Sequence, residues 1–201
     1  MQQLIVQKFG GTSVGSGERI AAVAEIIKKE AEINNVVVVV SAMAGETDRL
    51  IELSKQFGDN QNKREFDALI STGEKVSASL LAMALNSLGL KAKSYSAAQV
   101  SLKTTSNFSK AMILDIDKAK MEEILSDDSI PIITGFQGIT ESGEVTTLGR
   151  GGSDTTAVAI AASIKADRCD IYTDVDGIYT TDPRIVPVSY THLTLPTSND
   201  V

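Results

Sequence analysis

The sequence has few of the residues that mark secreted, metal-binding or membrane-spanning proteins. A single cysteine, Cys169, cannot form an internal disulfide and is typical of a reducing compartment such as the cytoplasm. A single histidine, His192, leaves no ligand spacing that predicts a metal site and no Ser-His-Asp nucleophile triad. The longest apolar run, Val36–Val40 with its flanks, is far too short to span a bilayer. The opening run Leu4–Val6 is strand-sized, so we expect no secretory leader.

Basic residues are also in the minority. The chain has 19 lysines and arginines against 26 aspartates and glutamates, a formal net charge of −7 at pH 7. This excess of acid argues against a nucleic-acid partner or an anionic membrane surface. An anionic substrate would therefore have to be attracted by local cations, such as Lys8 and Arg150. The remaining composition, 42% hydrophobic over 201 residues, is that of a globular protein with one large domain or two small ones.

Apolar periodicity predicts an alternation of strands and helices. Apolar runs predict strands at 4–9, 36–40, 91–96, 130–136 and 168–173, with a weaker hairpin over 101–116. Helical spacing predicts helices at 16–31, 47–57, 63–88, 117–125 and 153–164, with Asp117 and Ser153 as N-caps and a break at 71–74. The alternation indicates an α/β fold with a mainly parallel sheet covered by helices on both faces. Ligands collect at the carboxyl ends of such strands, where the loops 9–13, 41–47, 135–138 and 173–179 would meet.

Two glycine-rich loops lie at the expected strand-to-helix junctions. They are Lys8-Phe9-Gly10-Gly11-Thr12-Ser13-Val14 and Thr147-Leu148-Gly149-Arg150-Gly151-Gly152-Ser153-Asp154. Glycine lets the backbone approach a ligand closely, and bare N–H groups at a helix start attract anions. The first loop is not a Walker A loop, because the order Gly-x4-Gly-Lys is absent. Two such loops in one chain suggest a protein that holds a polyphosphate and a second anion face to face.

Four charged side chains in or near these loops are candidates for chemistry. Lys8 could neutralise the oxygens of a transferring phosphoryl group, or it could be a surface lysine after a buried strand. Arg150 could capture a carboxylate with its planar fork, or it could be a solvated loop residue. Asp154 could orient a lysine or an ammonium group, or it could only stabilise the helix dipole. Glu74 could accept a hydrogen bond from a substrate amine, although exposed helical glutamates are common.

The segment 173–184 has two possible interpretations. Its acids, together with Tyr179 and Arg184, could hold the ribose, the base and the phosphates of a nucleotide. The Asp-Gly and Asp-Pro pairs in the segment equally mark turns, so the acids could be turn-formers alone.

These segments, in this order, resemble the aspartate kinases of the amino acid kinase family. The resemblance runs from about Leu4 to Pro187. Besides the two glycine loops, it is carried by Ser41-Ala42-Met43-Ala44-Gly45-Glu46-Thr47, Ser71-Thr72-Gly73-Glu74, Gly135-Phe136-Gln137-Gly138 and Tyr172–Arg184.

The resemblance implies a three-layer αβα sandwich that transfers a phosphoryl group from ATP to the β-carboxylate of aspartate. The product, 4-phospho-aspartate, is the first step toward lysine, threonine, methionine and diaminopimelate. By analogy, the nucleotide is bound by Lys8, Phe9, Gly10, Gly11, Thr173, Asp174, Tyr179 and Arg184. Aspartate is bound by Ser41, Thr47, Glu74, Arg150 and Ser153, with Arg150 on the α-carboxylate. Lys8 and Asp154 are the catalytic residues. Magnesium would bridge the phosphates, so no protein metal cage is expected, and the intact enzyme would be a homo-oligomer.

The resemblance also sets expectations for the end of the chain. Kinases of this family continue with a further lysine of the nucleotide site and with ACT regulatory domains, whereas here the match stops after Pro187. Residues 1–187 are thus expected to be an incomplete catalytic domain, and residues 188–201 a non-native tail of translated vector sequence. The alternative is a true, divergent C-terminus. On the first interpretation, turnover by this chain would be weak or absent, without feedback inhibition.

Other functions remain as alternatives. Glutamate 5-kinase, acetylglutamate kinase, carbamate kinase and uridylate kinase share the fold but are not expected to carry both glycine loops in this form. A non-catalytic ligand-binding fragment is a possibility of a different class. A Rossmann dehydrogenase is disfavoured, because no Gly-x-Gly-x-x-Gly follows the first strand.

Overall fold

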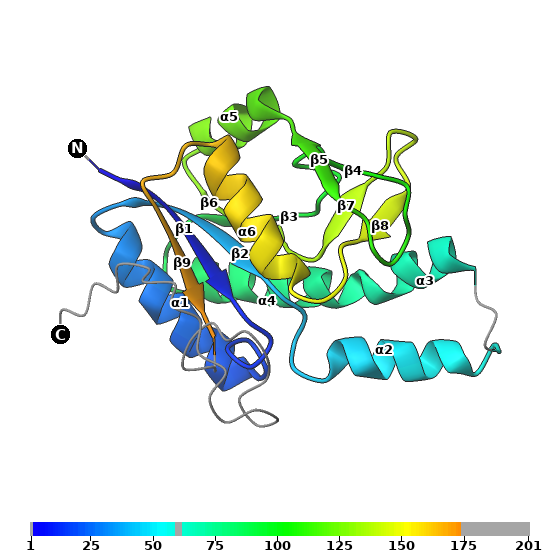
Figure 1. The fold of residues 1–201 in the computed structure, drawn as a ribbon. Coiled ribbons are helices and arrows are strands. Elements are labelled where there is room, and N and C mark those ends of the chain that lie inside the picture. Colours follow the sequence, from blue (N-terminus) through cyan, green and yellow to red (C-terminus); the bar gives the residue numbers. More distant parts are fainter. Residues whose placement is uncertain (1, 59–61, 174–201) are drawn as a thin grey trace, which may run out of the picture.

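The computed structural model describes residues 2–58 and 62–173, which alternate between strands and helices (Figure 1). In chain order the elements are β1 (Leu4–Phe9), α1 (Gly17–Ala31), β2 (Asn35–Val40), α2 (Glu46–Lys55), α3 (Lys63–Ile70), α4 (Thr72–Ser87), β3 (Ala92–Tyr95), β4 (Leu102–Thr104), β5 (Ile113–Ile116), α5 (Lys118–Ser126), β6 (Ile130–Thr134), β7 (Gln137–Ile139), β8 (Val145–Thr147), α6 (Gly152–Ser163) and β9 (Arg168–Tyr172).

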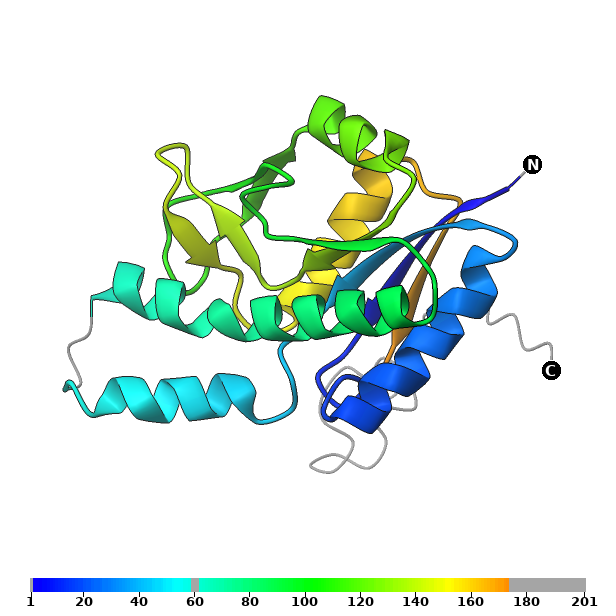
Figure 2. The same cartoon turned by 180° about the vertical axis from the view of Figure 1, so that it is seen from behind.

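The main sheet is parallel and has the strand order β3-β6-β2-β1-β9. Helix α6 covers one face of the sheet, with α5 beside it, while α1 and α4 cover the other, as the two opposite views show (Figures 1 and 2). The valine run of β2 serves both cores. Val36, Val38 and Val40 pack toward α1 and α4, whereas Val37 and Val39 pack toward α5 and α6. The predicted three-layer αβα sandwich is therefore confirmed.

A second, four-stranded sheet with the order β5-β4-β7-β8 stands beside the main one (Figure 1). The predicted hairpin over 101–116 is confirmed as the antiparallel pair β4–β5. The hairpin β7–β8 was not predicted, and the expected loop 135–138 was wrong at its end, because β7 begins at Gln137. Its strands are three residues long, and Gly138 packs against Leu102 and Thr104 so tightly that a side chain would overlap them. So short a strand shows no periodicity to recognise.

Of the two predicted helix caps, one is confirmed and one was wrong. Asp117 caps α5 as predicted, by accepting a hydrogen bond from the backbone N–H of Lys120. Ser16, for which no cap was predicted, caps α1 by accepting from the N–H of Arg19. Ser153 was predicted to cap α6, and this was wrong. The N-cap is Gly151 at φ 71°, a left-handed conformation that favours glycine, and Ser153 lies inside the first turn.

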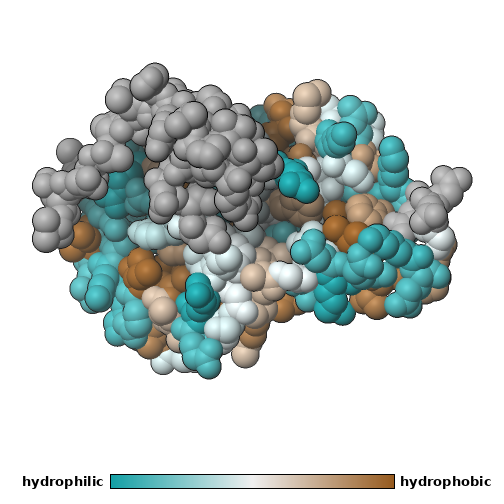
Figure 3. Space-filling model, turned by 60° about the horizontal axis from the view of Figure 1, so that its bottom comes forward, coloured by the Kyte–Doolittle hydropathy of each residue, from teal (hydrophilic) through white to brown (hydrophobic). Residues whose placement is uncertain are grey.

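The predicted break at 71–74 is also confirmed, since α3 ends at Ile70 and α4 begins at Thr72. The buried Gln137 side chain donates a hydrogen bond of 2.9 Å to the carbonyl of Ser71 at this junction. By length and composition alone, the run Lys63–Ser87 could cross a membrane, since an 18-residue window within it has a mean hydropathy of 1.2. Half of its apolar window is buried within the domain, so it is a pair of core helices. On the face that carries α1 and α2, hydrophilic and hydrophobic residues are interspersed (Figure 3).

Candidate active site

A cavity of about 550 Å³ opens at the carboxyl ends of the central strands β1 and β2. Seven residues predicted from the sequence to bind substrate or to act in catalysis line it together. They are Lys8, Ser41, Thr47, Glu74, Arg150, Ser153 and Asp154. The remaining lining residues are Ala42, Asp48, Ile51, Ile70, Phe136, Gly149, Gly151 and Gly152.

Three helices begin at this cavity. Thr47 and Asp48 lie in the first turn of α2, Glu74 in the first turn of α4, and Ser153 in the first turn of α6. None of these three helix starts is capped by a hydrogen bond from the side chain of its N-cap residue. The N–H groups of Glu46 and Gly152, the first residues of α2 and α6, donate to the carbonyls of Met43 and Gly149. The positive ends of the α2 and α6 dipoles still favour anions in the cavity.

Lys8 reaches the cavity from β1, where it lies between Val39 of β2 and Ile171 of β9 in register. It is buried, and its Nζ atom lies 2.7 Å from Oδ1 of Asp154 in the first turn of α6. The alternative of a surface lysine was wrong. An ammonium group has three donors, so the ion pair with Asp154 leaves Lys8 able to bind ligand oxygens as well.

Glu74 is buried at the start of α4, with 2% of its surface exposed, so the alternative of an exposed helical glutamate was wrong. Its Oε1 atom accepts a hydrogen bond of 3.2 Å from the backbone N–H of Ala42. Its Oε2 atom is buried and has no partner among the described residues. Burial raises the pKa of the Glu74 carboxyl to about 7, although the N–H groups of Glu74 and Ala42 oppose the rise. The free oxygen is therefore available to a donor in the cavity.

Arg150 lies at the edge of the cavity, in the turn between β8 and α6. Its guanidinium is exposed and makes no hydrogen bond or ion pair with any residue in 2–58 or 62–173. The turn itself is fixed, because the N–H of Leu148 donates to the carbonyl of Phe136 at 2.9 Å and that of Gly152 donates to Gly149 at 3.1 Å. A free guanidinium on a fixed turn suits the capture of a carboxylate.

The first glycine loop lies beside Lys8. A Cβ atom added to Gly10 would be 3.4 Å from the Nζ atom of Lys8, and one added to Gly11 would be 2.8 Å from the carbonyl oxygen of Ala42. The N–H of Gly10 donates to the carbonyl of Tyr172. The N–H groups of Gly11 and Thr12 donate to no acceptor within the described segments. These bare donors next to a lysine suit phosphate oxygens.

The residues predicted to bind the nucleotide differ in where the structure places them. The side chain of Phe9, predicted to be a nucleotide-binding residue, is buried in the core and stacks on Tyr172 with ring centroids 4.5 Å apart. Its ring is therefore not available to a nucleotide, and only its backbone could take part. Thr173 is exposed and directly follows β9. Asp174, Tyr179 and Arg184 lie outside the described residues. Within the described segments, no three His, Cys, Asp or Glu side chains form a group that could hold a metal ion.

Sequence reasoning missed three residues that shape the site. Phe136 and Asp48 line the cavity, and their positions directly after Gly135 and Thr47 were the available signal. Asp67 was missed altogether, because nothing in the local sequence distinguishes it from a surface aspartate on a helix. It is fully buried and binds Ser109 and Thr147.

Comparison with known proteins identifies the family. Residues 3–195 match the model of the amino acid kinase family. An aspartate kinase of Pseudomonas putida is 58% identical over 185 residues, which are 92% of this chain and 45% of that relative. The chain thus spans less than half the length of this curated relative.

Two solved structures have the same fold. Aspartate kinase from Synechocystis has a TM-score of 0.75 and 51% identity, over 92% of this chain and 30% of that one. E. coli aspartokinase III, solved in complex with aspartate and ADP, has a TM-score of 0.74 and 30% identity, over 93% of this chain and 53% of that one. The sequence, the fold and the position of the cavity agree, and the chain belongs to the amino acid kinase family.

Proposed function

We propose that this chain is a catalytic part of an aspartate kinase, which phosphorylates the β-carboxylate of L-aspartate with ATP. One observation carries the proposal. A single cavity presents a free guanidinium, that of Arg150, and a buried carboxylate oxygen without a partner, that of Glu74, beside the ammonium of Lys8. This set complements an α-amino acid that carries a second carboxylate. The similarity to aspartate kinases over 92% of the chain supports the same substrate.

The charges in the cavity define how aspartate would bind. Arg150 would take the α-carboxylate as a bidentate pair, and Glu74 would accept a hydrogen bond from the α-ammonium group. The β-carboxylate would then point toward Lys8 and the first glycine loop. The hydroxyl groups of Ser41, Thr47 and Ser153 line the same cavity and would complete the hydrogen bonds of the substrate.

The reaction needs positioning and charge more than proton transfer. An oxygen of the β-carboxylate attacks the γ-phosphorus, the bond to the β,γ-bridging oxygen breaks, and ADP leaves with that bond's electrons. The carboxylate is already ionised, so no base is required. Lys8 and the bare N–H group of Gly11 would stabilise the charge on the transferring oxygens, while Asp154 holds the ammonium of Lys8 in place. The N–H of Gly10, expected from the resemblance to act in the same way, already donates to the carbonyl of Tyr172.

The nucleotide would lie on the side of the loop where Gly10 binds the end of β9. We assign it to Thr173, Asp174, Tyr179 and Arg184 together with the backbone of residues 9–11. The bare N–H groups of Gly11 and Thr12 suit its phosphates. Bound magnesium would neutralise charge on the phosphate oxygens of the nucleotide.

In the cell, this activity would provide the first intermediate toward lysine, threonine, methionine and diaminopimelate. We place it in the cytoplasm, where a lone cysteine stays reduced. The intact enzyme would be a homo-oligomer, and we expect weak turnover from the 201-residue chain.

A thermal-shift titration tests the proposal through binding. The chain is melted with magnesium and a non-hydrolysable ATP analogue, and aspartate, glutamate, acetylglutamate or uridylate is then added in turn. A ligand that binds the folded state raises the Tm by mass action. We expect a rise with the analogue and a further rise with aspartate alone. A further rise with a different substrate would assign the site to another kinase of the family. Binding without turnover, even in the full-length protein, would identify a ligand-binding module.

A further inference from the structure

A buried carboxylate outside the cavity holds the loop that carries Arg150. Asp67 lies within α3, and its side chain is fully inaccessible to solvent. Its Oδ2 atom accepts hydrogen bonds from the backbone N–H groups of Ser109 and Thr147, each at 2.8 Å. Its Oδ1 atom accepts from the hydroxyl groups of the same two residues, at 2.9 and 3.1 Å. One side chain thus binds two segments that are 42 and 80 residues away in the sequence.

These four donors match an ionised carboxylate. A carboxylate only accepts hydrogen bonds, and its two oxygens have room for all four. A buried charge is unfavourable unless it is compensated. No lysine, arginine or histidine in the described segments forms an ion pair with Asp67. The hydrogen bonds to Ser109 and Thr147 must therefore compensate the charge, which makes the positions of both residues tightly coupled to Asp67.

Thr147 connects Asp67 to the loop that carries Arg150 in the candidate active site. It is the last residue of β8, and its N–H is bound by Asp67 while its carbonyl accepts a hydrogen bond of 2.9 Å from the N–H of Ala111. Leu148 follows and is bound to Phe136, and Arg150 lies two residues further on. Because the guanidinium of Arg150 contacts no described partner, the backbone anchored at Thr147 sets its place over the cavity.

Ser109 supports the same loop from its other side. It has φ 69°, in the left-handed region that residues other than glycine seldom adopt. Both its N–H and its hydroxyl group bind Asp67, so the carboxylate holds this conformation. A Cβ atom added to Gly149 would lie 3.6 Å from the carbonyl oxygen of Ser109, so the Ser109 turn packs directly against the neighbour of Arg150.

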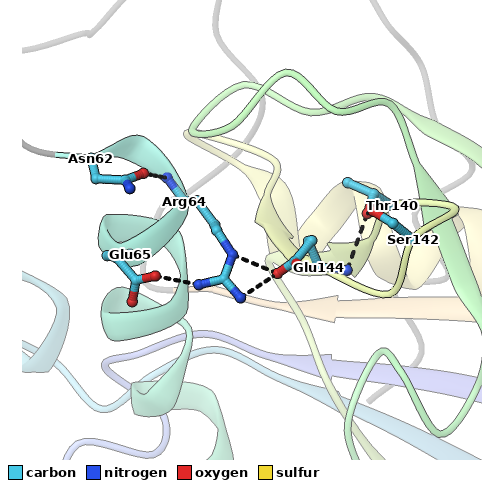
Figure 4. Close-up of polar contacts among 6 residues, drawn as sticks. All are labelled: Asn62, Arg64, Glu65, Thr140, Ser142 and Glu144. Carbon is cyan, nitrogen blue, oxygen red and sulfur yellow. Dashed lines mark hydrogen bonds and ion pairs between the residues drawn. The ribbon is translucent and has the colours of Figure 1, made fainter.

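Helix α3 contacts the β7–β8 hairpin a second time, away from the cavity. Arg64 forms an ion pair of 2.6 Å with Glu144 and also pairs with Glu65 (Figure 4). The side chains of Arg64 and Glu144 are both exposed, and such pairs contribute little to stability. Arg64 thus offers a matched control, because it joins the same two elements as Asp67 without touching Thr147 or Ser109.

We infer that Asp67 is a positioning residue for substrate recognition, whose carboxylate holds the backbone at Thr147 so that Arg150 faces the carboxylate of the substrate. The inference rests on the proposed function, because it gives Arg150 an amino-acid carboxylate to bind. Asp67 itself touches neither the cavity nor the reacting atoms. Its effect is on where the guanidinium lies.

Three variants of the chain separate positioning from general stability. Asp67→Ala leaves four donors unpaired. Asp67→Asn can keep the geometry, since its oxygen can accept from the two N–H groups while its NH₂ group donates to the two hydroxyl oxygens. Arg64→Gln removes the second contact between α3 and the hairpin. If Asp67→Ala does not fold, Thr147→Val is the milder variant, because it removes one hydroxyl donor and keeps the N–H donor.

Two measurements are made on each variant. Hydrogen–deuterium exchange without ligand compares the amides of residues 147–152 with those of residues 41–47. Calorimetry with magnesium and the ATP analogue then compares aspartate with the nucleotide. For Asp67→Ala we expect exchange at 147–152 to rise on the order of tenfold or more, with 41–47 unchanged. Aspartate affinity should fall about 10- to 100-fold, with nucleotide affinity unchanged. Asp67→Asn should restore both quantities, Arg64→Gln should alter neither, and Thr147→Val should show a smaller form of the Asp67→Ala pattern.

The outcomes that overturn the inference are distinct from those that overturn the proposed function. Unchanged exchange at 147–152 in Asp67→Ala, or in Thr147→Val where the first does not fold, would refute the anchor. An equal rise at 41–47, or the same effect from Arg64→Gln, would reduce Asp67 to a stabilising residue. Another outcome is that the unmodified chain binds no aspartate while Asp67→Ala still raises exchange at 147–152. That result would support the role of Asp67 in holding this backbone and would show that the proposed substrate is wrong.

Discussion

Lys8 and Asp154 form an ion pair of 2.7 Å in which only one partner is buried, since 8% of the Lys8 side chain is exposed and 46% of that of Asp154. This difference in exposure determines how much each side chain depends on the ion pair. The Asp154 side chain as a whole keeps contact with water, although its paired Oδ1 atom is buried, whereas Lys8 has lost most of its hydration and depends on Asp154.

Removing Asp154 is therefore expected to destabilise the fold more than removing Lys8. Asp154→Ala leaves a buried ammonium without its counter-charge, and we expect a loss of about 3 kcal/mol in the free energy of unfolding. Lys8→Met replaces the lysine by an apolar side chain of similar length and should cost about 1 kcal/mol or less. Urea denaturation of both variants measures the difference. Equal losses would show that the pair contributes symmetrically, against the burial seen here.

Glu74 should make stability depend on pH in an unusual direction. Its folded pKa of about 7 lies above its ordinary value of 4.5, so between these pH values the folded state binds a proton that the unfolded state has released. The free energy of unfolding should then fall as pH rises from 4.5 to 7, by about 3 kcal/mol in all from this group. Glu74→Gln removes the titration.

The measurement is urea denaturation of the unmodified chain and of Glu74→Gln from pH 5 to pH 8. The difference between the two isolates Glu74 from the other titrating groups. We expect Glu74→Gln to gain relative stability with rising pH. Parallel curves would mean that the carboxyl of Glu74 titrates near its ordinary pKa.

Arg150→Lys is expected to weaken aspartate binding without changing stability. Lysine keeps the charge but loses the planar fork that holds a carboxylate with two hydrogen bonds, which should cost about 2 kcal/mol of binding free energy. Stability should be unchanged, because Arg150 is exposed and contacts no partner in the described segments. Calorimetry gives the affinity and thermal melting gives the stability. A large loss of nucleotide affinity in this variant would place Arg150 on the phosphates.

Gly11→Ala should impair nucleotide binding, since the new Cβ atom would lie 2.8 Å from the carbonyl oxygen of Ala42 and the loop would have to move. Gly17→Ala is the matched control. It lies at the start of α1 with nothing within 4 Å of the new atom, so it should stabilise the chain by about 0.5–1 kcal/mol. The Tm shift produced by the ATP analogue reports the effect. An unchanged shift in Gly11→Ala would show that the nucleotide does not approach this backbone.

The main sheet could be predicted because its strands are buried on both faces. In β2 the residues from Val36 to Val40 are all apolar, and such a run is readily recognised whatever its neighbours are. The β7–β8 hairpin could not be predicted, because its strands are short. Gly138 of β7 also packs against Leu102 and Thr104, which lie more than 30 residues earlier in the sequence. Local sequence does not encode such contacts.

The candidate site, like the fold, could be predicted only in part from the sequence. Lys8, Glu74 and Arg150 could be proposed from the motifs around them, since glycines and hydroxyl residues mark ligand loops. The burial of Glu74 could not be predicted, because its carboxylate contacts the backbone N–H of Ala42, which is 32 residues away in the sequence. Ser153 was expected to cap α6, but Gly151, which can adopt φ 71° at little cost, begins the helix. With three glycines among the four residues 149–152, the sequence alone does not decide which one turns the chain.

The late position of β9 in the chain bears on the order in which the protein is synthesised. Among the residues that the structure describes, those that line the cavity lie between Lys8 and Asp154, so they leave the ribosome before β9 does. Until β9 arrives, β1 has an unpaired edge that carries the buried residues Ile5, Val6 and Phe9. An apolar edge strand of this kind is a template for pairing with other chains. A pause in translation ahead of β9 would therefore leave a nascent chain that has already made the described lining of the cavity but whose sheet is open to aggregation.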